Sequence, residues 1–239
     1  MLIAGVDEAG RGCVIGPLVI CAYACGDDDE KKLRELGARD SKELSDSARE
    51  KAAEKLRPAG EFATIEISPE EITEYMAKKI SLNEMEAEKI VEGLKLLGKK
   101  TGNVKTERDG KNKEGMEKIS KVFVDSPDPN PEKFEKRIRK YLRTEGMEIE
   151  KIISENKADS KYACVGAASI IAKSLREKRI EEIKKEIGIN FGSGYTSDER
   201  TIRFLKEHVN DENIQKHIRH RWETIRRLKE TKIKLSDFV

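Results

Sequence analysis

The sequence has few of the residues that build disulfide frameworks or zinc sites. It contains four cysteines and three histidines among 239 residues. The cysteines show no CxxC spacing and no partnering histidines, which argues against a zinc site. Two of them, Cys21 and Cys25, would share one face of a strand, and we expect both to pack as small hydrophobic side chains.

Long hydrophobic runs and an excess of charge of one sign are also missing. No segment approaches the roughly 18 apolar residues of a membrane span, and no signal peptide precedes the first strand, so we expect a cytoplasmic protein. Charged residues make up 39% of the chain, yet 48 Lys and Arg against 46 Asp and Glu leave a net charge of only +2. This balance indicates ion-paired surfaces, and residues 216–234 are strongly basic while the first strands are not.

The hydrophobic pattern predicts an α/β protein in which strands and helices follow one another along the chain. Strands are expected at residues 2–7, 18–25, 61–67, 121–125 and 150–155. Helices are expected at residues 46–57, after the capping boxes at Ser68 and Ser81, and at residues 131–146, 160–187 and from the capping box Thr196 to Glu199 onward. The polar segment 99–121 is expected to be a surface insertion with a short helix at residues 115–120.

The first predicted strand leads into two adjacent carboxylates, Asp7 and Glu8, and then into a glycine-spaced turn. Strand side chains alternate between faces, so both acids can serve one site only if the strand ends or bends near Glu8. The spacing of Gly10, Gly12 and Gly16 loosely matches a dinucleotide-binding fingerprint, but a strand-like segment follows where that fingerprint needs a helix. The remaining alternative from these residues alone is a hairpin turn with a solvated acidic rim.

Two further acids stand where elements end or begin, Asp125 after the fourth strand and Asp159 before the longest helix. Residues at the carboxyl ends of neighbouring strands converge on one crevice, where gathered carboxylates repel unless a divalent cation neutralises them. Oxygen ligands select Mg²⁺ or Mn²⁺, and two ions about 3.5 to 4 Å apart suit phosphodiester hydrolysis. Alternatively, Asp159 could cap the helix and Asp125 could open an Asx turn.

Five segments of the chain, in order, resemble the motifs of ribonuclease HII, most closely its archaeal form. They are Val6–Gly12, Asp40–Leu44, Val122–Asp125, Lys157–Asp159 with Ala167–Lys173, and Gly192–Tyr195. The resemblance implies a ribonuclease H-like five-stranded mixed sheet flanked by helices. It further implies a catalytic domain over residues 1–190 and a helical C-terminal region over residues 191–239.

The same resemblance implies an endonuclease for RNA–DNA hybrids and for ribonucleotides embedded in duplex DNA. The enzyme would hydrolyse the RNA strand of hybrids and nick on the 5′ side of embedded ribonucleotides, leaving 3′-hydroxyl and 5′-phosphate ends. Two alternatives stay open, another nuclease on the same fold that cuts DNA, and a non-catalytic nucleic-acid-binding module.

Individual roles follow from the matched positions. The catalytic, metal-binding acids would be Asp7, Glu8, Asp125 and Asp159, with Mg²⁺ or Mn²⁺ as a two-ion cofactor. The turn Gly10-Arg11-Gly12 would sense the ribose 2′-hydroxyl, the group that separates RNA from DNA. Tyr195 would stack beside that sugar and Lys42 would contact a phosphate. From the residues alone, Tyr195 could equally be a half-buried core residue and Lys42 a solvated lysine.

The C-terminal region carries two further expectations. Four arginines are expected to grip backbone phosphates, although such a run can also be a plain helix face; they are Arg219, Arg221, Arg226 and Arg227. The tail residues Leu235, Phe238 and Val239 resemble a sliding-clamp-binding tail, with Lys232 where that motif prefers glutamine. The tail could instead pack back on its own helices. We expect a monomer that acts in DNA replication and repair.

Overall fold

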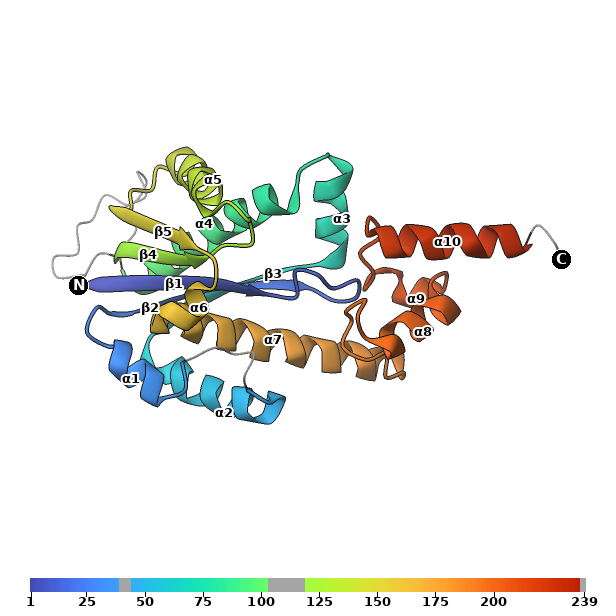
Figure 1. The fold of residues 1–239 in the computed structure, drawn as a ribbon, viewed down its shortest axis with the longest axis horizontal. Coiled ribbons are helices and arrows are strands. Elements are labelled where there is room, and N and C mark those ends of the chain that lie inside the picture. The colour runs from blue at the N-terminus through green and yellow to red at the C-terminus, as the bar shows by residue number, and fades with distance from the viewer. Residues whose placement is uncertain (39–43, 103–118, 237–239) are drawn as a thin grey trace. The chain divides into compact units, whose positions relative to one another are not determined.

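The structure is a computed structural model that describes residues 1–38, 44–102 and 119–236, with the backbone alone for residues 231–236. Five strands form one sheet in the order β3-β2-β1-β4-β5. They are β1 (Leu2–Ala9), β2 (Leu18–Gly26), β3 (Glu61–Ile67), β4 (Ile119–Asp125) and β5 (Lys151–Glu155). β4 runs parallel to both β1 and β5. The predicted five-stranded mixed sheet flanked by helices is confirmed (Figure 1).

The helices connect these strands and fill the C-terminal part of the described chain (Figure 1). They are α1 (Glu30–Glu35), α2 (Asp46–Leu56), the 3₁₀ turn η2 (Arg57–Ala59), α3 (Pro69–Ala77), α4 (Leu82–Lys100), α5 (Pro131–Thr144), α6 (Ala158–Lys161), α7 (Ala163–Ile187), α8 (Glu199–His208), α9 (Glu212–Gln215) and α10 (Glu223–Ser236).

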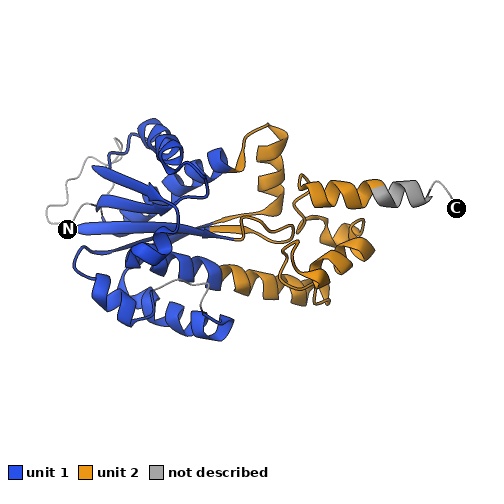
Figure 2. Ribbon diagram, in the orientation of Figure 1, with its two compact units in different colours: residues 1–9, 20–65, 83–174 blue, residues 10–19, 66–82, 175–239 orange. Residues whose placement is uncertain are grey.

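The chain divides into two compact units, shown in different colours in Figure 2. Unit 1 comprises Met1–Ala9, Ile20–Ile65 and Asn83–Ser174. Unit 2 comprises Gly10–Val19, Glu66–Leu82 and Leu175–Val239. The division into domains at residue 190 stays a prediction.

Unit 1 is a sheet covered by helices on both faces. Figure 1 shows α4 and α5 on one side of the strands, and α1, α2 and the beginning of α7 on the other. α5 begins at Pro131 behind the side chain of Asn130, which accepts a hydrogen bond from the Lys133 N–H, and its apolar stripe of Phe134, Ile138 and Leu142 is buried as predicted.

Unit 2 has its own apolar core, built from the segment after β1 and from helices near the C-terminus. Its buried members are Val14, Ile15, Ile180, Ile183, Phe191, Phe204, Leu205, Val209, Ile214, Ile218 and Ile225. The segment around residues 14–15 is therefore fixed by hydrophobic contacts with residues more than 150 positions later in the chain.

Several predicted boundaries are wrong. β1 continues through Ala9, two residues beyond its predicted end at residue 7. The expected single helix from residue 160 is two helices, α6 and α7, separated by Tyr162 in an extended conformation. β4 starts at Ile119, where the end of a short helix was expected, and residues 103–118 lie outside the described part. α8 is capped by Asp198 and not by Thr196.

A glycine sets how closely β1 and α7 approach. A β-carbon at Gly5 would overlap the backbone of Cys164 and Val165, whereas a β-carbon at Gly93 would lie 3.6 Å from Ile65 in ordinary contact. We expect Gly5→Ala to cost about 3 kcal/mol or more, because backbone atoms would have to move. Gly93→Ala, inside α4, should instead stabilise by up to about 1 kcal/mol. Urea unfolding of both variants measures this, and equal effects would contradict it.

Candidate functional site

The parallel pairing of β1 and β4 places Asp7 beside Asp125. Val6 on β1 is in register with Val124 on β4, so the acids occupy the next positions on adjacent strands. Asp7 is only 5% exposed, and Asp125 is half-buried at the end of β4. The structure thus brings together two acids that are 118 residues apart in the sequence.

Asp7 is held in a strongly perturbed environment. Burial, and secondarily the negative charge of Asp125, raise the pKa of Asp7 to about 7. Three contacts favour the ionised form and limit this rise, namely a hydrogen bond from Ser169, the nearby ammonium of Lys173, and the Glu8 N–H, which donates to Asp7 Oδ1 at 2.7 Å. Lys173 Nζ in turn donates to Ser169 Oγ at 3.1 Å. An added cation would remove most of the cost of ionising this carboxyl group.

Asp125 and Asp159 are linked through the start of α6. The Ala158 N–H donates to Asp125 Oδ1 at 2.7 Å, and the next residue is Asp159, which is 2% exposed. The residue before α6 is Lys157, in the left-handed conformation, and it makes no side-chain capping bond. Asp159 is therefore not the N-cap of a long helix, because Asp125 satisfies the Ala158 amide and Asp159 lies inside the first turn.

The fourth predicted acid, Glu8, directly follows Asp7 on β1. It lies half-buried on a strand that continues to Ala9, so its side chain alternates with that of Asp7. Within the described ranges, no group of three or more His, Cys, Asp or Glu side chains is arranged to hold a metal ion. The structure pairs Asp7 with Asp125 and ties Asp159 to that pair through the backbone of Ala158.

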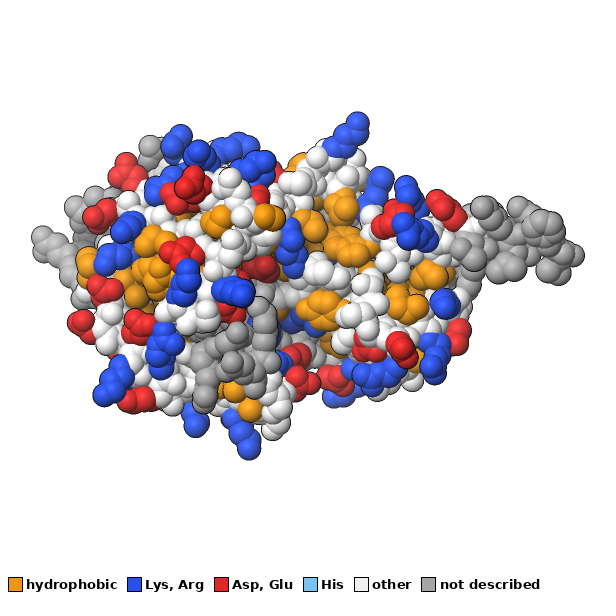
Figure 3. All heavy atoms as spheres, viewed as in Figure 1, with side chains coloured by type: hydrophobic (Ala, Val, Ile, Leu, Met, Phe, Trp, Pro, Cys, Tyr) orange, Lys and Arg blue, Asp and Glu red, His pale blue; other side chains and the backbone are white. Residues whose placement is uncertain are grey.

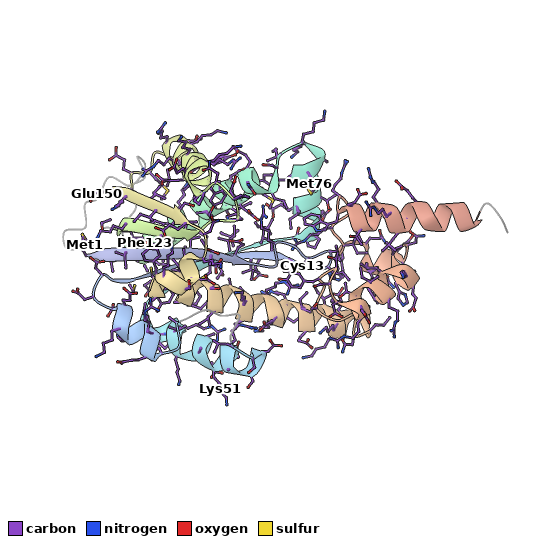
Figure 4. The ribbon with its side chains drawn as sticks, viewed as in Figure 1. Met1, Cys13, Lys51, Met76, Phe123 and Glu150 are labelled. Atoms are coloured by element: carbon purple, nitrogen blue, oxygen red, sulfur yellow. The ribbon has the colours of Figure 1, made fainter. Side chains whose placement is uncertain are left out.

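The glycine turn and Tyr195 come together in unit 2. Gly10 has φ +87°, and a β-carbon there would lie 2.5 Å from Arg176 Nε, so the position requires glycine. Gly12 is exposed, and a β-carbon on it would lie 4.0 Å from the Tyr195 ring. Cys13, labelled in Figure 4, forms an isolated antiparallel bridge with Tyr195. These contacts place the turn and the tyrosine side by side.

A buried arginine orients Tyr195. The Arg176 guanidinium carbon lies 4.7 Å from the centre of the Tyr195 ring, and Nη2 donates to the Ser193 carbonyl at 2.8 Å. Burial, and then the neighbouring Cys13, raise the pKa of Tyr195 to about 12. The phenol therefore stays protonated at neutral pH and can donate a hydrogen bond. Tyr195 is half-buried, as expected if it were a core residue. The packing of its ring nevertheless fixes where its hydroxyl group lies.

The structure bears on only some of the predicted phosphate contacts. Arg219 is fully buried and donates to backbone carbonyls, so its predicted grip on phosphates is wrong. Arg221 is exposed, while Arg226 and Arg227 both pair with Glu223. Lys42, Phe238 and Val239 lie outside the described residues, as does the side chain of Leu235.

Sequence reasoning missed the side chains that hold the acids and the turn. Ser169 and Lys173 stand four residues apart on α7, and that spacing in a small apolar run could have identified them as one inward face. Asn156 donates to the carbonyls of Ser126 and Asp128, both at 3.0 Å, which fixes the loop after Asp125. The role of Arg176 could not be predicted from spacing alone, because its partners are distant in the sequence.

The surface agrees with the balanced composition. On the face shown in Figure 3, Lys and Arg side chains alternate with Asp and Glu, as expected for a surface of many ion pairs. None of the helices in the described part of the chain combines the length and hydropathy that a membrane span needs.

Comparison with known proteins identifies the family. The family model for ribonuclease HII matches residues 4–225. Ribonuclease HII of Archaeoglobus fulgidus is 40% identical over 227 residues, covering 95% of this chain and 96% of the relative. The crystal structure of ribonuclease H2 from Pyrococcus horikoshii matches with a TM-score of 0.76 at 38% identity, covering 98% of this chain and all of that one.

Two further solved structures match the fold. One is the complex of PCNA with RNase HII from Archaeoglobus fulgidus, with a TM-score of 0.75, 39% identity and coverage of 93% and 96% of the two chains. The other, Bst-RNase HIII in complex with Mn²⁺, has a TM-score of 0.76 at 20% identity, covers 98% of this chain and 71% of that one, and supports the fold alone. Sequence and structure together show that the chain belongs to the ribonuclease HII family and is a ribonuclease H endonuclease.

Proposed function

We propose that the chain hydrolyses the RNA strand of RNA–DNA hybrids and nicks on the 5′ side of ribonucleotides embedded in duplex DNA, leaving 3′-hydroxyl and 5′-phosphate ends. The observation that carries this proposal is the buried Asp7 beside Asp125 on parallel strands. A buried pair of neighbouring carboxyl groups is energetically costly to ionise, and proteins keep such pairs where they bind a cation or transfer a proton. In this role the protein would work as a cytoplasmic monomer in DNA replication and repair.

The residues present fit a divalent metal cofactor. Carboxylate oxygens are ligands that Mg²⁺ and Mn²⁺ prefer, and the raised pKa of Asp7 marks a place where positive charge is favourable. The ligands would be Asp7, Glu8, Asp125 and Asp159, with two ions. When bound, the ions would supply an activated water and charge stabilisation at the phosphate. Manganese is the ion held by the related Bst-RNase HIII structure.

The chain's own groups would orient these acids. The Glu8 N–H and the Ser169 hydroxyl each bond Asp7, while the Ala158 N–H fixes one oxygen of Asp125. These bonds orient the two carboxyl groups in the way that hydrogen bonds around a metal site orient its ligands. The acids would therefore need little reorganisation when the substrate arrives.

Recognition of the sugar would fall to the glycine turn and Tyr195. Glycines let backbone groups come within hydrogen-bond reach of a ribose, and the protonated Tyr195 phenol can donate to a 2′-hydroxyl. A nuclease of the same fold that cuts DNA would not need the glycine turn beside Tyr195, because its substrate lacks the 2′-hydroxyl group. A non-catalytic binding module would have no use for a buried Asp7. Exposed Arg221, together with Lys42, would contact phosphates.

The first test uses a DNA duplex with one embedded ribonucleotide, incubated with Mg²⁺ or Mn²⁺. We expect a single nick on the 5′ side of that ribonucleotide and none in the all-DNA duplex. Asp7→Asn should lower kcat by at least about 10²-fold, because the amide cannot replace a metal-binding charge, while Kd for the duplex stays within a few-fold. Asp28→Asn, at an exposed position in the same unit, is the matched control and should leave kcat unchanged.

Two results would contradict this proposal. Equal cutting of the all-DNA duplex would favour a DNA nuclease on the same fold. Binding of the duplex without cleavage in either metal would favour a non-catalytic module.

The proposal extends to a sliding-clamp partner through Leu235, Phe238 and Val239. Its support is the resemblance of this tail to clamp-binding tails, together with the structure of the Archaeoglobus fulgidus RNase HII complex with PCNA. Deletion of residues 235–239 should weaken clamp binding at least about tenfold, by calorimetry, because the apolar anchors are lost. Nicking of free substrate should not change. Lys232→Gln, which restores the preferred glutamine, should strengthen binding, and equal affinity of all three proteins would rule the tail out.

A further inference from the structure

Arg219 lies in the segment between α9 and α10 and is fully buried, which is unusual for an arginine. Its Nη1 donates to the Arg11 carbonyl at 2.8 Å and its Nε donates to the Gly16 carbonyl at 3.1 Å. Its backbone N–H donates to the Val14 carbonyl at 2.9 Å. Arg219 therefore makes hydrogen bonds to the loop of residues 11–16 at three points, namely Arg11, Val14 and Gly16.

The surrounding contacts keep this guanidinium in place. Ile218 forms an antiparallel bridge with Ile15, and the Gly16 N–H donates to the His217 carbonyl at 2.9 Å. The Trp222 ring lies 5.1 Å from the guanidinium carbon, measured to the ring centre. A planar guanidinium can satisfy two carbonyls at fixed angles while stacked on an aromatic ring, which an ammonium cannot do.

The bond to Arg11 has a consequence for the peptide unit between Arg11 and Gly12. This peptide is trans, so its C=O and its N–H point in opposite directions in one plane. Because Arg219 fixes the Arg11 carbonyl toward the protein interior, the Gly12 N–H must point the other way. Gly12 is exposed, and no described residue accepts a hydrogen bond from its N–H. The Tyr195 ring lies beside the same glycine.

We propose that Arg219 is a positioning residue for ribose recognition, because its hydrogen bond to the Arg11 carbonyl presents the Gly12 N–H beside Tyr195. This inference rests on the proposed function of the glycine turn as the reader of the sugar. Loss of the guanidinium lets the peptide rotate, so the turn no longer offers its donor at a fixed place. The acids of unit 1 keep their own contacts, so metal dependence is unaffected.

The test compares Arg219→Lys and Arg219→Gln with the wild type. The matched control is Arg203→Gln, at an exposed position on α8 of the same unit. For each protein, Tm reports folding, and fluorescence anisotropy without divalent metal gives Kd for a single-ribonucleotide duplex and for the all-DNA duplex. Nicking assays give kcat, KM and the Mg²⁺ concentration at half-maximal rate.

Both Arg219 variants should lose most of the preference for the ribonucleotide duplex while Kd for the all-DNA duplex stays within about twofold. Their kcat/KM should fall at least about tenfold at an unchanged Mg²⁺ requirement. Folded variants that keep the wild-type preference would overturn this inference alone. Failure of both variants to fold would also overturn it, since Arg219 would then be only a core residue. A wild type without ribose preference would overturn it together with the proposed function.

Discussion

The site depends on the burial of two neighbouring carboxyl groups at adjacent positions of parallel strands. The β1 and β4 register determines that Asp7 and Asp125 are neighbours, and burial together with the charge of Asp125 makes ionisation of Asp7 unfavourable. Ser169, Lys173 and the backbone amide of Glu8 offset only part of this cost. The fold therefore carries a local instability of the kind that a bound cation would relieve, which is typical of sites built for function.

The turn and the tyrosine of unit 2, which we propose recognise the sugar, are organised differently, through backbone groups held by buried arginines. Arg176 packs on Tyr195 and against Gly10, and Arg219 bonds the carbonyls of Arg11 and Gly16. Both arginines are buried, so neither offers its charge to the surface. Affinity that comes from an exposed basic patch is independent of the sugar, whereas oriented backbone donors beside a tyrosine can distinguish one sugar from another.

Hydrophobic periodicity and capping residues predicted the helices and strands well where interactions between residues close in the sequence determine the structure. The period of Phe134, Ile138 and Leu142, the cap at Ser68 and the alternation in residues 61–67 each gave the observed element. The break at Tyr162 and the extension of β1 through Ala9 depend on tertiary contacts, such as the close approach at Gly5, that no local window contains. The acids were predicted from their positions at element ends, but Arg219 was misassigned, because its carbonyl partners lie about 200 residues earlier in the chain.

The central claim is that Asp7 sits beside Asp125 in a buried pair whose ionisation is suppressed without metal. Carbon-13 NMR titration of the Asp7 carboxyl in the metal-free protein tests it most directly. We expect a pKa of about 7, well above the ordinary 3.8, and a lower value in Asp125→Asn that burial still keeps above 3.8. An Asp7 that titrates near 3.8 in both proteins would contradict the pairing, and with it the account of the site.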